Sequence, residues 1–266
     1  MISVDTAIDE VYGDLSSGAN FDQILQLAHK GAVAGSLTGP PCETFSAARN
    51  LQMEQQQGPR PLRTAAQPWC LQDRTARELR QCDTGSELLM NSFQFEAEVV
   101  CAGGGAIMEH PAEPQDEHKV SVWRLECHRQ WCMKLPGACH HRIEQWLYGA
   151  SGVKPTNLRA LNLGPPITVG KALISGAEPW RVRPQQGLKG KGEDGKFRTA
   201  QAKEYPSALC RSLVVALLKG LQYRIHTAGV RDPVTPSDSE LRWIVQMRHQ
   251  SEVLAHNVFF PDYQKT

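Results

Sequence analysis

The sequence of 266 residues contains no apolar run long enough to cross a membrane. A spanning helix needs about 20 predominantly apolar residues, so we expect no membrane-spanning segment. A strong net charge is also missing, because 29 lysine and arginine residues face 28 aspartate and glutamate residues. This balance excludes a strong global field for nucleic acid or acidic membranes, although it does not exclude local basic patches.

An export signal is missing as well. The first residues, MISVDTAIDEVYGD, carry acidic side chains where a secretory leader needs basic residues and a long apolar stretch. We therefore expect an intracellular protein that is not secreted. In such a protein the eight cysteines are expected to be reduced thiols, metal ligands or one nucleophile, rather than a disulfide framework.

Short apolar segments alternate with segments of helical periodicity along most of the chain. Strands are expected at residues 32–37, 106–108, 142–147 and 158–163, and helices at 21–30, 44–53, 88–102, 120–135 and 205–225. This alternation predicts an α/β fold with a doubly wound, mostly parallel sheet.

The length of the chain predicts one or two domains, at about 150 residues per domain. We expect one domain over residues 1–225, with long polar loops at 54–83 and 181–203. Residues 226–266 are expected to form a C-terminal extension with a terminal helix, because Ser237 and Glu240 have the spacing of a capping box.

Polar residues follow the short apolar run at 2–4 and the expected strands at 32–37 and 106–108. They are Asp5, the Pro40-Pro41-Cys42 loop, and Glu109. In sheets of this class, ligands bind beyond the carboxyl ends of the strands. The three positions therefore predict a functional site.

Cys42 and Glu109 carry the reactive groups of this predicted site. Cys42 follows two prolines and precedes an expected helix, whose dipole would lower the pKa of the thiol and favour a nucleophile. The alternative is a structural cysteine after a tight turn. At the end of a buried strand, desolvation would raise the pKa of Glu109, so that it could protonate a ring nitrogen. The alternative is a helix cap or an ion-pair partner.

The stretch GSLTGPPCETFSAAR at 35–49 resembles the catalytic loop of cytosine-C5 DNA methyltransferases, whose pattern is G-x-P-C-x-x-F-S. Later stretches resemble further motifs of this family in the same order, namely EHP at 109–111, YGASGVKPTNLRALNLG at 148–164 and FRTAQAKEYPSALCRSLVVAL at 197–217. SVD at 3–5 and GDL at 13–15 resemble its acidic cofactor positions. The likeness covers about residues 2–220 and is closest to a divergent, retroelement-associated branch.

This resemblance implies an S-adenosylmethionine-dependent methyltransferase with a Rossmann-like fold, acting on DNA in the nucleus. Cys42 would attack C6 of a flipped-out cytosine, and Glu109 would hold and protonate N3. Asp5 would bind the ribose of S-adenosylmethionine, and Asp14 its adenine amine. The resemblance also places Pro40 and Pro41 beside the cofactor, and Ser46, Arg49, Lys154 and Thr156 at the nucleic acid.

The sequence departs from the family in three places. His110 follows Glu109 where the family has Asn, and the family's QxRxR strand is replaced, with Lys154 and Thr156 as the nearest polar candidates. The first strand and its Gly-rich turn, which would precede Ile2, have no counterpart. We therefore expect an N-terminally truncated relative with weak or no cofactor binding. The alternative is a catalytically inactive, retroelement-derived fragment that at most binds nucleic acid.

Cysteine and histidine residues crowd one further stretch of fifteen residues: Cys127, His128, Cys132, Cys139, His140 and His141. Zinc sites favour C-x2–4-C spacings, whereas the gaps here are C-x4-C and C-x6-C. We expect reduced thiols and a partly exposed histidine cluster without metal. The alternative is a small zinc-assisted binding module.

Overall fold

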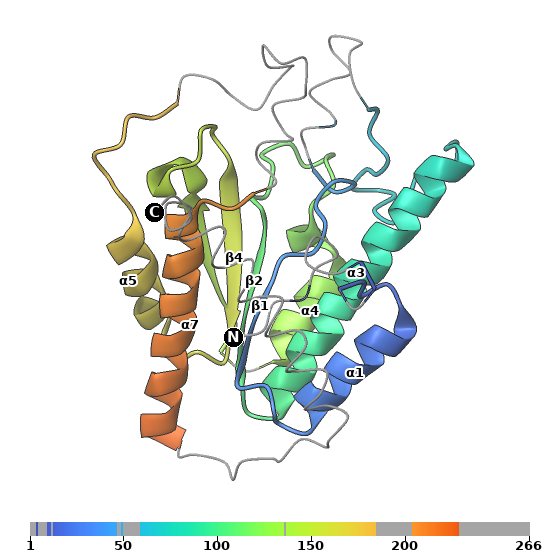
Figure 1. Cartoon of the computed structure of the whole chain (residues 1–266). Helices are drawn as coiled ribbons and strands as arrows, with labels where there is room; N and C mark the ends of the chain where they lie inside the picture. Colours follow the sequence, from blue (N-terminus) through green and yellow to red (C-terminus); the bar gives the residue numbers. More distant parts are fainter. Residues whose placement is uncertain are drawn as a thin grey trace, which may run out of the picture.

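The computed structural model describes residues 4, 10–11, 13–46, 49, 59–135, 137–184 and 204–228. A four-stranded sheet lies between two groups of helices (Figure 1). The helices and strands are α1 (Gly18–His29), β1 (Gly35–Thr38), α3 (Ala76–Cys101), β2 (Gly105–Pro111), α4 (Glu126–Lys134), β3 (Cys139–Glu144), β4 (Pro155–Leu161), α5 (Pro166–Gly176) and α7 (Ser207–Ala228). Two 3-10 turns complete the set, η1 (Val122–Arg124) and η2 (Gln145–Tyr148).

The sheet confirms the α/β class, but the expectation of a mostly parallel sheet is wrong for the described residues. The strand order is β1-β2-β4-β3, in which only β1 and β2 run parallel. β4 is antiparallel to both β2 and β3. The connections explain the difference, because β1 and β2 are joined by a helical crossover through α3, whereas β3 returns to β4 through a short loop.

Each face of the sheet packs against one group of helices, because successive side chains of a strand point to opposite faces. Ile107 of β2 faces α5 and α7, in a cluster that includes Leu158, Leu163, Leu173, Leu209 and Ala216. Its neighbour Met108 faces α3 and the η1–α4 segment, in a cluster with Phe45, Leu89, Phe93, Val122 and Trp123. The two largest clusters of the described core therefore lie on opposite sides of the sheet.

α3 begins twelve residues before the expected helix at 88–102. Its start is fixed by a capping box, in which the Glu78 backbone N–H donates to Thr75 Oγ1 and the Thr75 backbone N–H donates to Glu78 Oε2. This arrangement satisfies backbone donors that the first turn of a helix leaves free. The end of the expected loop at 54–83 is therefore helical.

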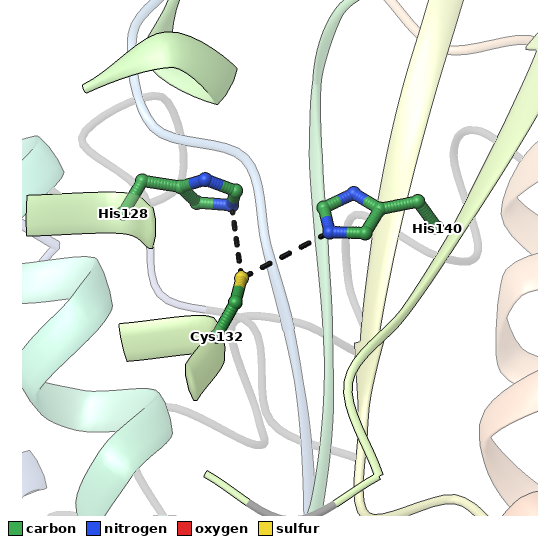
Figure 2. A group of neighbouring side chains, drawn as sticks. All are labelled: His128, Cys132 and His140. Atoms are coloured by element: carbon green, nitrogen blue, oxygen red, sulfur yellow. Dashed lines mark hydrogen bonds between the residues drawn. The ribbon is translucent and has the colours of Figure 1, made fainter. Parts of the chain in front are cut away.

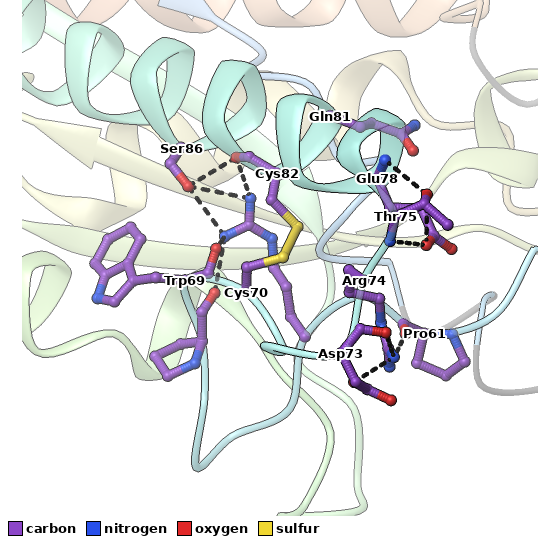
Figure 3. Close-up of a disulfide and its surroundings, with 12 residues drawn as sticks. Pro61, Trp69, Cys70, Asp73, Arg74, Thr75, Glu78, Gln81, Cys82 and Ser86 are labelled. Atoms are coloured by element: carbon purple, nitrogen blue, oxygen red, sulfur yellow. Dashed lines mark hydrogen bonds and ion pairs between the residues drawn. A yellow bond between two sulfur atoms is a disulfide. The ribbon is translucent and has the colours of Figure 1, made fainter.

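Residues 59–75 of that expected loop are held against α3 (Figure 3). Cys70 and Cys82 form a disulfide, with their Cα atoms 6.0 Å apart. The expectation that cysteines serve only as thiols, ligands or a nucleophile is thus wrong for this pair. Arg63, which is 1% exposed, donates to the carbonyls of Trp69 and Cys82 and to Ser86 Oγ.

Other expected elements differ in extent or lie outside the described residues. The expected helix at 120–135 is split, because Leu125 is extended between η1 and α4. α5 is not among the expected helices, and its start at Pro166 suits the first turn of a helix. Most of the expected helix at 44–53, the loop residues 185–203 and the extension from residue 229 onward lie outside the described residues.

Among the described helices, none combines the length and the apolar character that crossing a bilayer requires.

Candidate active site

Cys42 and Glu109 lie at the same end of two neighbouring parallel strands. Cys42 is in the loop that follows β1, and Glu109 is next to Met108 of β2, the partner of Thr38 in the β1–β2 ladder. The carboxylate of Glu109 is close enough to influence the pKa of the Cys42 thiol. The structure therefore brings together the two residues that the sequence predicts. Glu109 lies within β2 rather than beyond the end of a strand.

Three proton-donating groups surround the Glu109 carboxylate, which is buried. Tyr205 Oη donates a hydrogen bond of 2.5 Å to Oε2. Gln145 Nε2 donates to Oε1 at 3.3 Å, and Lys154 Nζ lies 3.7 Å from the same oxygen. Lys154 Nζ is also 5.1 Å from the centroid of the Tyr205 ring. Glu109 is therefore an acceptor at the centre of a polar network.

Lys154 and Thr156, which the resemblance places at the nucleic acid, belong to this network. Thr156 is fully buried, and its Oγ1 accepts a 2.9 Å hydrogen bond from Gln145 Nε2. The side chains of Lys154 and Thr156 therefore contact Glu109 directly or through Gln145. Both residues lie at the predicted site, in contact with protein groups that hold the carboxylate in place.

Tyr205 and Gln145 are site residues that the sequence analysis missed. Tyr205 lies just before α7, and Gln145 opens η2 within an expected strand. Burial raises the pKa of Tyr205 well above its usual value, and the Glu109 charge raises it further, so the phenol remains a donor. A Cβ on Gly39 would lie 2.7 Å from Tyr205 Oη, so the loop approaches Tyr205 closely at a residue without a side chain.

The Cys42 thiol differs from the expected nucleophile in its resting protonation state. Burial raises the pKa of Cys42, whereas the nearby charge of Lys154 lowers it and that of Glu109 raises it. The expectation that a helix dipole lowers this pKa is wrong, because desolvation outweighs the favourable charges. Residues 43–45 form a turn. At rest the group is a thiol, and it must lose its proton to attack.

Arg49 anchors the loop that carries Cys42. Its guanidinium donates to the backbone carbonyls of Glu43 at 2.7 Å and Arg60 at 3.1 Å, and to Gln81 Oε1 at 3.0 Å. The Ser46 carbonyl accepts from the Arg49 backbone N–H. The predicted contacts of Ser46 and Arg49 with nucleic acid would have to coexist with these bonds or replace them.

An open depression of about 600 Å³ lies beside this anchored loop. Its lining side chains are Arg49 and residues from the loop before α3 and the first turns of that helix, namely Pro59, Arg60, Thr75, Arg77, Glu78 and Gln81. Three of the seven are arginines, and Glu78 pairs with Arg60 at 2.7 Å. The depression therefore offers basic groups next to the Cys42 loop.

The predicted cofactor residues are only partly described. Asp5 lies outside the described residues. Asp14 lies in the turn before α1, where its Oδ1 accepts from the Ser16 backbone N–H at 2.9 Å and from Ser16 Oγ at 2.6 Å. These bonds lower the pKa of Asp14, which is therefore ionised at neutral pH. Pro40 is buried and Pro41 is exposed in the loop before Cys42.

A second group of reactive side chains lies between α4 and β3 (Figure 2). His128, Cys132 and His140 place one ligand atom each within 4.8 Å of the others, and could hold a metal ion. Burial lowers the pKa of His128 to about 3 and also lowers that of His140, so both rings are neutral at neutral pH. The spacings between cysteines do not indicate the pair His128 and Cys132, which lie one helical turn apart on α4.

Comparison with known proteins gives no relative of this chain. No family model matches it, and neither a curated protein nor a solved structure matches it. Its function therefore has to be inferred from the arrangement of side chains around Cys42 and Glu109.

Proposed function

We propose that this chain carries the active site of a cytosine-C5 DNA methyltransferase, with Cys42 as the nucleophile and Glu109 as the residue that holds the base. One observation carries the proposal. A cysteine thiol and a buried carboxylate lie at the same end of two parallel strands, and the charge of Glu109 raises the pKa of the Cys42 thiol. The sequence stretches around both residues resemble the corresponding motifs of that family.

The chemistry of cytosine matches these two groups. C5 of cytosine is a poor nucleophile until a thiolate adds to C6, and protonation at N3 makes the ring ready for that addition. The target base must leave the duplex, because the reacting atoms are otherwise stacked. Glu109, in its protonated form, would donate its proton to N3 through one oxygen and accept a hydrogen bond from the exocyclic amine through the other. The positive charge of Lys154 favours the thiolate form of Cys42.

S-adenosylmethionine supplies the methyl group when it is bound. Asp14 fits a role beside it, because an ionised, partly exposed carboxylate can accept a hydrogen bond from an adenine amine. The turn that contains Asp14 precedes α1, and α1 leads directly back to β1 (Figure 1). Asn91 of α3 donates to the backbone carbonyl of Leu15, next to Asp14, so this turn packs against α3.

The fold supports the same proposal in part. β1, α3 and β2 form a parallel β-α-β unit with helices on both faces of the sheet. We infer that this unit belongs to a doubly wound, methyltransferase-type sheet, to which β3 and β4 are an antiparallel addition. Antiparallel strands at the edge of otherwise parallel sheets are common in doubly wound folds.

The expected nucleic-acid partner is duplex DNA, which also makes the nucleus the expected location. Arg49, Arg60 and Arg77 line the depression beside the Cys42 loop. Contacts of basic side chains with phosphates supply most of the sequence-independent affinity for DNA. The overall charge of the chain is nearly balanced, so such contacts would depend on this local group of arginines.

The proposal is tested by hydrogen exchange at C5 of cytosine. Addition of the Cys42 thiolate to C6 makes C5 basic, and C5 then takes a proton from water. Loss of the original tritium from C5 to water then breaks the C6–S bond and regenerates the thiolate. The full chain would be incubated with DNA tritiated at C5, with and without S-adenosylmethionine, and tritium in water would be counted. We expect release by the wild-type chain and a loss of at least about 1000-fold in Cys42→Ser.

Cys101→Ser is the matched control, because Cys101 is an exposed cysteine at the end of α3. It should release tritium at the wild-type rate. Equal release by wild type and Cys42→Ser would contradict the proposal. Absence of both tritium release and methyl transfer from the wild-type chain would also contradict it.

The second candidate function is nucleic-acid binding without catalysis. It is favoured by one observation, namely that both oxygens of Glu109 are engaged by the protein, through Tyr205 on one side and Gln145 and Lys154 on the other. If this network is permanent, a cytosine cannot reach the carboxylate. This function predicts DNA binding that is unchanged in Cys42→Ser and no release of tritium.

A further inference from the structure

Three ligand-type side chains converge on one point between α4 and β3 (Figure 2). His128 and Cys132 belong to α4, and His140 belongs to β3. Cys132 Sγ lies 3.5 Å from His128 Nε2 and 3.9 Å from His140 Nε2. Both imidazole rings therefore direct their Nε2 atoms toward the sulfur of Cys132.

We propose that His128, Cys132 and His140 bind a zinc ion, with a fourth position open to water. In tetrahedral zinc sites the Zn–S bond is about 2.3 Å and the Zn–N bond about 2.0–2.1 Å, which separates sulfur and nitrogen by about 3.6 Å. The two observed separations, 3.5 and 3.9 Å, bracket this value. Both sulfur–nitrogen separations are thus close to those that an ion requires, and all three ligand atoms lie within 4.8 Å of one another.

The neighbouring cysteine and histidine of β3 are not ligands of this site. Side chains alternate between the two faces of a strand, so Cys139 and His141 point away from His140. They contact each other instead, with Cys139 Sγ 3.5 Å from His141 Nε2. Cys127 packs against the core cluster that contains Trp123. Because His140 is exposed, water can reach the fourth position.

An aromatic ring and a paired cation lie next to the three proposed ligands. The Trp123 ring lies edge-on to both imidazoles, at centroid distances of 5.2 Å from His128 and 5.7 Å from His140. Arg159 is the nearby cation, and it is paired with Glu96. Burial raises the pKa of Cys132, and the charge of Arg159 offsets part of this rise. On binding, a Zn–S bond forms and the thiol proton is released to solvent.

The ligand set selects the kind of ion. Thiolate and imidazole ligands favour zinc and other borderline or soft metals, whereas magnesium and calcium prefer oxygen ligands. The bound ion would join α4 to β3, which is an edge strand of the described sheet. This role is independent of the Cys42 and Glu109 site, so either proposal can fail without the other.

Cobalt(II) is the probe that tests the proposal, because it replaces zinc in tetrahedral sites and absorbs visible light. The full chain would be freed of metal with a chelator and titrated with cobalt(II). We expect one ion per chain, a thiolate-to-cobalt charge-transfer band, strong visible bands of a four-coordinate ion, and displacement by zinc. Cys132→Ser should abolish the charge-transfer band.

Cys139→Ser is the matched control, because it removes a half-buried cysteine from the opposite face of β3. It should retain the band. If Cys132→Ser fails to fold by circular dichroism, His140→Ala replaces it, since His140 is exposed, and it should weaken cobalt binding more than tenfold. A wild-type chain without the band, a band that persists in folded Cys132→Ser, or unchanged affinity in His140→Ala would overturn the proposal.

Discussion

Individual residues at this site have properties that depend on burial more than on residue type. His110, which stands where the resembled family has Asn, is 2% exposed. Its ring lies edge-on to Phe45 and Trp123, and its Nε2 has no hydrogen-bond partner among the described residues. Burial lowers the pKa of His110 to about 3, with smaller contributions from the charges of Lys154 and His128.

This burial makes stability depend on pH. An unfolded histidine takes up a proton near pH 6.5, whereas His110 in the folded chain does so only near pH 3. Between these values the unfolded state binds more protons, so the free energy of unfolding falls as pH falls. The slope from one such ring approaches about 1.4 kcal/mol per pH unit. His128 contributes in the same direction.

We predict a shallower dependence for His110→Gln. Urea unfolding at pH 7.5, 6.0 and 5.0 would measure the free energy of unfolding of wild type and variant. The difference between them should change with pH by about 1 kcal/mol per pH unit below pH 6. His118→Gln, at an exposed position, should keep the wild-type slope. Parallel profiles of wild type and His110→Gln would contradict the prediction.

The candidate site could be predicted from the sequence only where its residues are marked by local motifs. Cys42 after two prolines and Glu109 after an apolar run are such residues. Tyr205 donates to Glu109 across 96 positions of sequence, and Gln145 does so across 36. Contacts of this kind are created by tertiary packing, so nothing in the spacing of residues indicates them. The thiol pKa was mispredicted for the same reason, because burial is not a local property.

At the scale of elements, the disulfide fastens the segment before α3 to that helix. Cys70 and Cys82 are 12 residues apart in sequence. In the chain-entropy account, a crosslink closing a loop of this size removes about 3 kcal/mol of conformational freedom from the unfolded state. The bond also holds the segment that supplies the buried Arg63.

Replacing both cysteines should therefore destabilise the chain. Cys70→Ala combined with Cys82→Ala is expected to lower the free energy of unfolding by about 2–3 kcal/mol, measured by urea denaturation. Adding dithiothreitol to the wild type should give a similar loss and should leave the double variant unaffected. A wild type that is insensitive to reduction, with complete reduction confirmed by thiol titration, would contradict the prediction.

The elements themselves were predicted better than their ends and directions. Apolar periodicity located segments that overlap β1 and β2, but it does not determine whether two strands run parallel, because connections decide that. α3 begins earlier than expected because Thr75 and Glu78 form its N-terminal cap. The polar composition of the residues that follow this cap suggested a loop. The 3-10 turn before α4 depends on packing of Val122 and Trp123 in the core.

At the scale of the whole molecule, a buried ion pair joins the helix α3 to the sheet. Arg159 of β4 donates to Glu96 of α3, and Thr38 of β1 donates to the other oxygen of Glu96. Both charged side chains are about 1% exposed. The guanidinium also lies 5.0 Å from the centroid of the Phe93 ring. The Glu96 carboxylate therefore connects α3 with both β1 and β4.

Breaking this pair from one side should be costly. Glu96→Leu leaves an uncompensated buried guanidinium, and we expect it to lower the free energy of unfolding by about 3–5 kcal/mol. Adding Arg159→Met should recover most of this loss, because apolar side chains of similar size can replace a buried ion pair. Guanidinium unfolding of both variants measures the coupling. A double variant that is less stable than Glu96→Leu would contradict this expectation.

The close approach of Gly39 to Tyr205 brings the loop that carries Cys42 next to the segment that precedes α7. Because a Cβ on Gly39 would lie 2.7 Å from Tyr205 Oη, a larger residue at position 39 has to displace either Tyr205 or the loop after β1. One added methyl group would therefore disturb two segments that are far apart in the sequence, the loop after β1 and the start of α7.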